Sequence, residues 1–250
     1  MIDLQKAQKA FIKYTNNYDL NDINITRKIY HSIRVMEYSK RIAENINLTK
    51  EQVDLASLIG LLHDIARFEQ WKRYGTYSDS ASIDHGDFSV ELLQENNFIR
   101  EFIDTDMYDD IIITAIKNHN KYKIEELEGE KLLQAQIIKD ADKLDIFYQI
   151  ATQYFKNPRE TEIQDISDDF WEEFQREQCV HKRPNSTDID DLILMTSFIY
   201  DIYYDYSFRI IHEEQFIEKI FGQFDFKKTE VKEKIEKVIS QANSYIINKM

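Results

Sequence analysis

Apolar side chains recur at steps of three and four residues along most of the chain, which is the spacing of one face of an α-helix. The clearest stripe consists of His31, Val35, Tyr38, Ile42 and Ile46. Thr49 and Gln52 have the spacing of a capping box, which predicts a helix that begins there and runs to Ala66. The same periodicity predicts further helices over 3–15, from the end of the polar loop 16–22 to about 46, and over 85–96, 107–120, 130–152 and 229–248.

The C-terminal part of the chain has a different pattern. Pro158 and Pro184 bracket an acidic segment in which Phe170, Trp171 and Phe174 have helical spacing. The Ser, Thr and Asp residues at 186–190 are suited to cap a long aromatic helix that continues through 199–208. We therefore expect one helical domain over 1–155 and a helical extension over 156–250 that packs on it. The extension is a candidate lid and a candidate homodimer surface.

Composition indicates an all-α fold. The 250 residues include only 5 Gly and 2 Pro, whereas β-sandwiches, propellers and Gly-rich nucleotide folds need many turn residues. A formal net charge of −14 argues against binding to long nucleic acids, because each phosphate contact needs a cation. No apolar run is long enough to span a membrane, and the first residues do not resemble a secretory signal. With a single cysteine, Cys179, the chain fits a reducing compartment, and we expect a cytoplasmic protein.

Six side chains that can bind a metal fall on apolar helix faces or at helix ends: His31, His63, Asp64, His85, His119 and Asp142. Taken alone, a His on an apolar face is usually a hydrogen-bonded core residue. An acid within a helix usually faces solvent, as we expect for Asp140 and Asp145. Burying several imidazole and carboxylate groups together is unfavourable, however, unless they are paired or bind a metal. A divalent cation binds both kinds of group. The remaining histidines, His181 and His212, are expected at the periphery.

The order of these residues resembles the HD-domain superfamily of metal-dependent phosphohydrolases. The resemblance covers about residues 25–150 and rests on His31 in HSIRV, His63-Asp64 in LLHDIA and Asp142 in the A-D-x-L context. It implies an all-α HD-domain helical bundle with a divalent ion held by His31, His63, Asp64 and Asp142. Periodicity alone does not choose Asp142 over Asp140, and the family context chooses Asp142. Asp140 stays a candidate for orienting a ligand imidazole.

Some branches of this superfamily insert two further histidines between the central pair and the last aspartate. His85 and His119 fall in that order, which implies a second ion bridged by the central Asp64. The alternative is that His85 caps one helix and His119 ends another. Imidazole and carboxylate ligands suit Mn, Fe, Co, Ni, Zn or Mg, so we expect one or two divalent ions without choosing the element. The G-Y-P signature of cyclic-di-GMP phosphodiesterases is absent.

The implied reaction is hydrolysis of a phosphate ester or anhydride by metal-activated water. Asp64 is expected to be a ligand and to accept or relay the proton of the water. Arg67 is the first candidate for binding phosphate, because it follows Asp64 by three residues, and Arg27 is the second, because it precedes His31 by four. For Lys117 and Lys143 we prefer an ordinary solvated charge.

We expect the substrate to be a small phosphorylated metabolite, with a nucleotide favoured. The loop 74–83 and the segment 162–177 are candidates for covering the site. Four aromatic residues are candidates for stacking on a base, although each is equally suited to a core: Trp71, Tyr77, Phe170 and Trp171. The alternative functions are a regulatory HD module that senses a nucleotide or metal without turnover, and a structural helical protein whose histidines are core residues.

Overall fold

The computed structural model describes residues 2–152 and 158–250. Over these ranges the protein is 70% helical and contains no strand, which confirms the expected all-α class. The described helices are too short or too polar to cross a membrane. The chain divides into two compact units, Met1–Asp142 and Lys143–Met250.

The first unit is built on helices whose starts follow from the sequence. It contains α1 (Leu4–Thr15), α2 (Ile23–Asn45), α3 (Lys50–Leu62), α4 (Arg67–Tyr74), α5 (His85–Gln94), α6 (Asp109–Asn118) and most of α7 (Gly129–Thr152), with short 3₁₀ segments η1 (Asp79–Ala81) and η2 (Glu95–Glu101). The Thr49–Gln52 capping box opens α3 as expected. The side chains of Asp3, Asp22 and Asp84 accept hydrogen bonds from the first turns of α1, α2 and α5.

Apart from α13 (Thr229–Lys249), the helices that lie wholly in the second unit are short. These are α8 (Pro158–Thr161), α9 (Asp168–Gln175), α10 (Asp188–Thr196), the 3₁₀ segment η3 (Ser197–Asp201), α11 (Asp205–Glu213) and α12 (Phe216–Phe221). Thr187 caps α10 within a capping box, which agrees with the cluster expected at 186–190. The long aromatic helix expected through 199–208 is wrong, because the backbone is extended at Ile202 and Tyr204. Residues 202–204 are one isoleucine and two tyrosines, and β-branched and aromatic residues favour extended backbone.

Helix α3 is shorter than the sequence predicts. The helix that begins at Thr49 ends at Leu62 rather than reaching Ala66, and a new helix begins at Arg67. His63 is the C-cap residue of α3, and its amide still donates to the Ile59 carbonyl oxygen, so that Asp64 lies in the turn between α3 and α4. The boundary expected at 155/156 touches residues outside the described ranges, whereas the division into units falls after Asp142. The extension as a packed lid or dimer surface stays a prediction.

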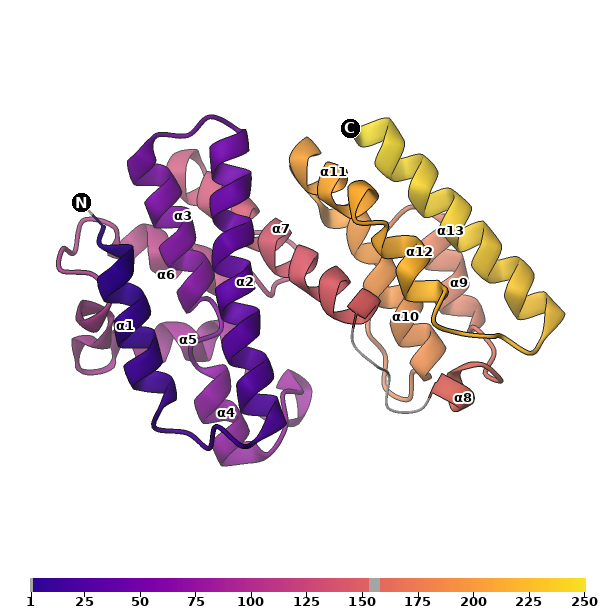
Figure 1. The fold of residues 1–250 in the computed structure, drawn as a ribbon, viewed down its shortest axis with the longest axis horizontal. Coiled ribbons are helices and arrows are strands. Elements are labelled where there is room, and N and C mark those ends of the chain that lie inside the picture. Colours follow the sequence, from indigo (N-terminus) through magenta and orange to yellow (C-terminus); the bar gives the residue numbers. More distant parts are fainter. Residues whose placement is uncertain (1, 153–157) are drawn as a thin grey trace. The chain divides into compact units, whose positions relative to one another are not determined.

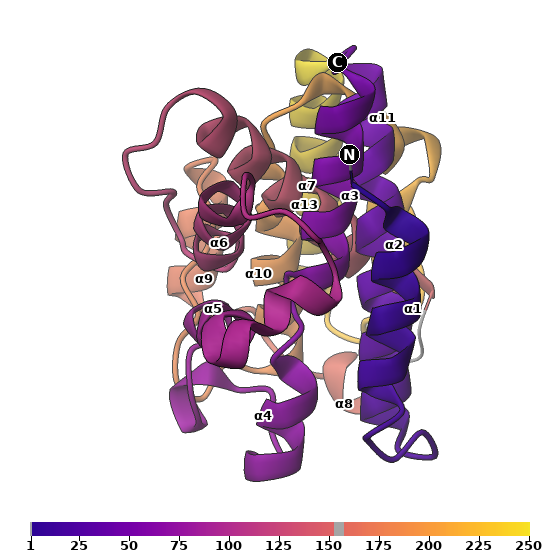
Figure 2. The same cartoon turned by 90° about the vertical axis from the view of Figure 1, so that its left-hand side faces the viewer.

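Helices α2 and α3 of the first unit lie side by side and pack against each other extensively (Figures 1 and 2). Gly60 makes it possible, because a Cβ there would lie 2.7 Å from Ser39 Oγ, 2.9 Å from Met36 Cα and 2.9 Å from the Val35 carbonyl oxygen. Since two of these neighbours are backbone atoms, rotating a side chain cannot make room. The pair α2–α3 matters for the rest of the molecule because it carries His31 and leads directly to His63.

Replacing Gly60 with Ala should therefore destabilise the protein, although Gly→Ala within a helix is ordinarily stabilising. We expect a loss of about 1–3 kcal/mol in the free energy of unfolding, from overpacking, measured by urea denaturation. Ser39→Ala provides the control: combined with Gly60→Ala it should restore only part of the loss, since the backbone contacts remain. An unchanged or raised stability of Gly60→Ala would contradict this account of the packing.

Candidate metal centre

Side chains from widely separated segments meet inside the first unit. His31 lies on α2, His63 and Asp64 in the turn after α3, His85 at the first position of α5, His119 at the end of α6 and Asp142 on α7. The four histidines and Asp64 are buried, and Asp142 is partly exposed. The structure thus brings together all six residues that the sequence singled out as metal ligands.

The first set of contacts joins His31, His63, Asp64 and Asp142. The Nε2 atoms of His31 and His63 are 3.1 Å apart. Asp64 Oδ2 lies 3.2 Å from His31 Nε2 and 3.5 Å from His63 Nε2. Asp142 Oδ1 lies 3.3 and 3.7 Å from the same two nitrogens. Four potential ligand atoms therefore converge on one small volume.

The second set of contacts uses the other oxygen of Asp64. Its Oδ1 lies 3.5 Å from His85 Nε2 and 3.7 Å from His119 Nε2, and these two nitrogens are 3.0 Å apart. The combinations whose ligand atoms all lie within 4.8 Å of one another include His31–His63–Asp64 and Asp64–His85–His119. Asp64 belongs to both and turns one oxygen toward each.

Three of the histidines are held by their outer nitrogens. His63 Nδ1 donates to the Gly60 carbonyl oxygen at 2.8 Å, and His119 Nδ1 donates to the Ile116 carbonyl oxygen at 2.6 Å. His85 Nδ1 donates to Asp79 Oδ2 at 2.5 Å. Because these partners only accept, each Nδ1 carries the proton in the neutral ring and each Nε2 presents a lone pair to the cluster.

The cluster is therefore rich in acceptors and poor in donors. Burial lowers the pKa of His63, and it lowers that of His85 to about 4, so both rings favour the neutral form. Asp64 Oδ1 is buried without a hydrogen-bond partner. Lone pairs that face each other at about 3 Å repel unless a proton or a cation lies between them. The donor set of imidazole nitrogen and carboxylate oxygen fits a divalent transition-metal ion.

Two cationic side chains balance the charge of Asp64. Lys28 Nζ lies 2.6 Å from Asp64 Oδ2, and Arg67 Nε lies 3.4 Å from Asp64 Oδ1. Burial alone would raise the pKa of this carboxyl, but the positive charges around it, first of all that of Lys28, outweigh burial and hold it well below its usual range.

On α2 the structure brings Lys28 against the cluster, whereas the sequence analysis had selected Arg27. Arg27 is exposed and is not brought into the cluster, whereas its neighbour Lys28 is. Spacings of four and three residues both lie on one helical face, so periodicity could not separate them. Lys143, expected to be solvated, is buried and pairs with Asp201 at 2.7 Å. Lys117 lies at the surface, 3.6 Å from Glu125.

Two acids on α7 were also misjudged. Asp140 and Asp145 were expected to face solvent, but both are fully buried. They lie in the inward-facing central part of α7, where the neighbouring Ala141 and Leu144 are equally buried. The orienting role of Asp140 stays a prediction. His181 and His212 are exposed, as expected.

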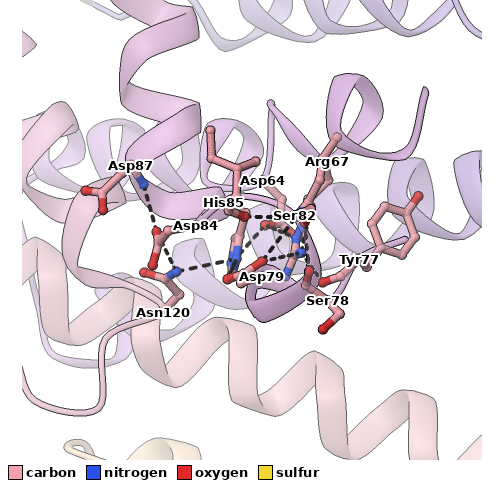
Figure 3. A network of polar contacts seen from close by, with 12 residues as sticks. Asp64, Arg67, Tyr77, Ser78, Asp79, Ser82, Asp84, His85, Asp87 and Asn120 are labelled. Atoms are coloured by element: carbon pink, nitrogen blue, oxygen red, sulfur yellow. Dashed lines mark hydrogen bonds and ion pairs between the residues drawn. The ribbon is translucent and has the colours of Figure 1, made fainter. Parts of the chain in front are cut away.

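Asp79, which the sequence analysis missed, links the loop 74–83 to the cluster (Figure 3). One of its oxygens receives the His85 ring proton, and the other lies 3.0 Å from the Arg67 guanidinium. His85 and Arg67 hold the pKa of Asp79 down at about 2 against the effect of burial. The same guanidinium nitrogen of Arg67 also donates to the Tyr77 carbonyl oxygen at 2.7 Å and to Gln70 Oε1 at 2.8 Å. The only signal in the sequence was a polar loop before His85.

Asp84 and Asn120 lie on the other side of His85 (Figure 3). Asp84 accepts the Asp87 amide at the start of α5 and receives a hydrogen bond from Asn120 at 3.0 Å. Gly86 allows this contact, because a Cβ there would lie 2.6 Å from Asn120 Oδ1. The backbone on both sides of His85 is thus fixed by polar contacts.

Comparison with known proteins agrees with this geometry. The family model of the HD domain matches residues 29–146. Residues 29–146 of this chain belong to the HD-domain superfamily. The matched range of the HD domain contains all six residues of the cluster. HD domains generally bind divalent metals and are generally metal-dependent hydrolases. A search of curated proteins and a search of solved structures found no significant match.

Because Asp79 orients His85 in this HD domain, Asp79→Asn should weaken metal binding without removing a ligand. We expect a loss in affinity of about ten- to a hundredfold for the ion that His85 contacts, as is usual for a carboxylate behind a ligand histidine. Titration calorimetry with Mn²⁺ measures the change. Asp87→Asn is the matched control, because Asp87 lies two residues from His85 but pairs with Lys121. Equal affinities for wild type and Asp79→Asn would refute the orienting role.

Proposed function

We propose that this HD domain hydrolyses a phosphate ester or anhydride of a small metabolite, with a nucleotide as the favoured substrate. The observation that carries the proposal is the pair of facing imidazole nitrogens on each side of Asp64, 3.1 Å apart on one side and 3.0 Å apart on the other. These buried acceptors are potential ligands for divalent cations. Membership of the HD-domain superfamily implies the reaction class. The ions considered are Mn, Fe, Co, Ni, Zn and Mg.

We assign two ions rather than one. His31, His63, Asp142 and one oxygen of Asp64 would hold the first, and His85, His119 and the other oxygen of Asp64 would hold the second. The support is the division of the Asp64 oxygens, because Oδ2 faces only the first histidine pair and Oδ1 only the second. The earlier alternative, in which His85 and His119 merely end helices, does not explain why their Nε2 atoms face each other.

The chain's own residues would have separate tasks in this reaction. Bound divalent ions lower the pKa of water and stabilise negative charge on a phosphoryl oxygen. Asp64, whose pKa is held low, suits a ligand that stays ionised, and this weakens its expected role as a proton acceptor. Arg67 would hold the loop 74–83 against the site through its contacts to Tyr77 and Asp79. Asp79 would keep His85 Nε2 directed inward.

An aromatic pair supports the choice of a nucleotide. Trp71 and Tyr77 lie with ring centroids 5.0 Å apart, and both are half-buried. Their polar atoms fix the rings, since Trp71 Nε1 donates to Asp22 at 2.6 Å and the Tyr77 hydroxyl donates to the Asn24 carbonyl oxygen at 3.0 Å. A base stacked on such a surface would lie next to the cations that pair with Asp64.

Several further expectations stay predictions. Phe170 and Trp171 belong to the second unit, and their contact with a substrate is part of the proposal only. The same holds for a homodimer and for a cytoplasmic location. The net charge of −14 supports a small substrate rather than a long nucleic acid.

The decisive experiment is a phosphate-release screen with Mn, Co, Ni or Zn added. Nucleotides, sugar phosphates and a bis-aryl phosphate are offered to wild type, to Asp64→Asn and to Asp87→Asn as the matched control. We expect wild type and Asp87→Asn to release phosphate or aryl alcohol, and Asp64→Asn to be at least about a hundredfold slower, because both ion sites lose a charged ligand.

Two outcomes would reject the proposal. Equal turnover by wild type and Asp64→Asn would show that the activity arises elsewhere. Tight binding of a metal and a nucleotide with no turnover of any substrate would favour the sensing module instead.

A further inference from the structure

Lys28 is the cation in direct contact with the Asp64 carboxylate. Its Nζ lies 2.6 Å from Asp64 Oδ2, and 19% of its side chain is exposed. It precedes His31 by three residues on α2, which places both side chains on one helical face. The ammonium also lies 5.6 Å from the centroid of the Tyr77 ring. Lys28 thus stands at the edge of the ligand cluster, between a buried carboxylate and an aromatic side chain.

The position of Lys28 conflicts with a cation in the first ion site. Asp64 Oδ2 also faces His31 Nε2 at 3.2 Å and His63 Nε2 at 3.5 Å. A divalent ion held by these groups would share that oxygen with the ammonium, and two positive charges repel each other strongly where water is scarce. Because the lysine ammonium is carried on a flexible four-carbon chain, Lys28 can leave the oxygen without a change in the backbone.

Arg67 does not have this freedom. One guanidinium nitrogen is already bonded to Gln70, Tyr77 and Asp79 at 2.7–3.0 Å. Only 12% of the Arg67 side chain is exposed, and its Nε is buried without a hydrogen-bond partner. Moving Arg67 would therefore release the loop 74–83 from the cluster. Arg27, the exposed neighbour of Lys28, has the same charge but lies outside the cluster.

We propose that Lys28 is a catalytic residue that exchanges partners. In the metal-free protein its ammonium neutralises Asp64, and in the metal-loaded protein it donates hydrogen bonds to the phosphoryl group of the substrate. The ligand class is a phosphoryl dianion, because a mobile ammonium adds positive charge beside that of the ions. This inference rests on the proposed function and adds that the Lys28 side chain contacts the substrate.

The test compares Lys28→Met, Lys28→Arg and the matched control Arg27→Met. Two affinities are measured by calorimetry: that of Mn²⁺ for the metal-free protein, and that of inorganic phosphate for the Mn²⁺-loaded protein. Lys28→Met should bind Mn²⁺ more tightly, by about threefold or more, because a competing cation is gone. It should bind phosphate about ten- to a hundredfold more weakly, because a charged hydrogen bond is lost.

The controls separate this role from a structural one. Lys28→Arg should keep phosphate affinity within about threefold of wild type, and Arg27→Met should change neither affinity. A merely structural lysine would lower Mn²⁺ and phosphate affinity together in Lys28→Met, and that result would overturn the proposal. Phosphate affinity unchanged in Lys28→Met would overturn it as well, as would a wild-type protein that takes up no divalent ion.

Failure of the proposed function can be distinguished from failure of this inference. A wild-type protein that binds Mn²⁺ and phosphate but hydrolyses no substrate would reject the phosphohydrolase. The opposite shifts in Mn²⁺ and phosphate affinity of Lys28→Met would then still establish the exchange at a phosphate-binding site. If Lys28→Met does not fold, Lys28→Gln replaces it with the same two expected shifts.

Discussion

The arrangement of this HD domain depends on one carboxylate placed between two pairs of facing imidazoles. Asp64 turns Oδ2 to His31 and His63 and Oδ1 to His85 and His119. Each pair brings its ring nitrogens to about 3 Å, a separation at which two lone pairs repel. The fold must hold these groups together against that repulsion, and cations relieve it. Packing, capping and the surrounding charges can all be understood from this constraint.

The scaffold meets the constraint through backbone contacts. Gly60 lets α2 and α3 approach closely, and its carbonyl oxygen receives the proton of His63 Nδ1. The Ile116 carbonyl oxygen likewise accepts a hydrogen bond from His119 Nδ1. His85 is held instead by a side chain, Asp79, on the loop 74–83. Through His85 the second histidine pair is therefore tied to a surface loop, whereas His63 of the first pair is tied to the helical core. Loop position and second-ion affinity should consequently depend on each other.

The sequence predicted the helices from one kind of signal and the potential ligands from another. Helix positions followed from periodicity and from caps such as Thr49, because both signals are local. The choice of Asp142 came from the family context, since spacing left Asp140 open, and the structure then placed Asp142 beside His31 and His63. Lys28, Asp79 and the buried state of Asp140 were missed because each depends on neighbours that are distant in the chain. The break at Ile202–Tyr204 was missed because an aromatic stripe was interpreted by spacing without weighing its preference for extended backbone.

The most direct test of the central claim is anomalous X-ray diffraction from crystals of the protein loaded with Mn²⁺. The account predicts two anomalous peaks, one on each side of the Asp64 carboxylate. The first should be bounded by His31, His63 and Asp142, and the second by His85 and His119. A map with no peak at Asp64, or with peaks only at other sites on the protein, would contradict it.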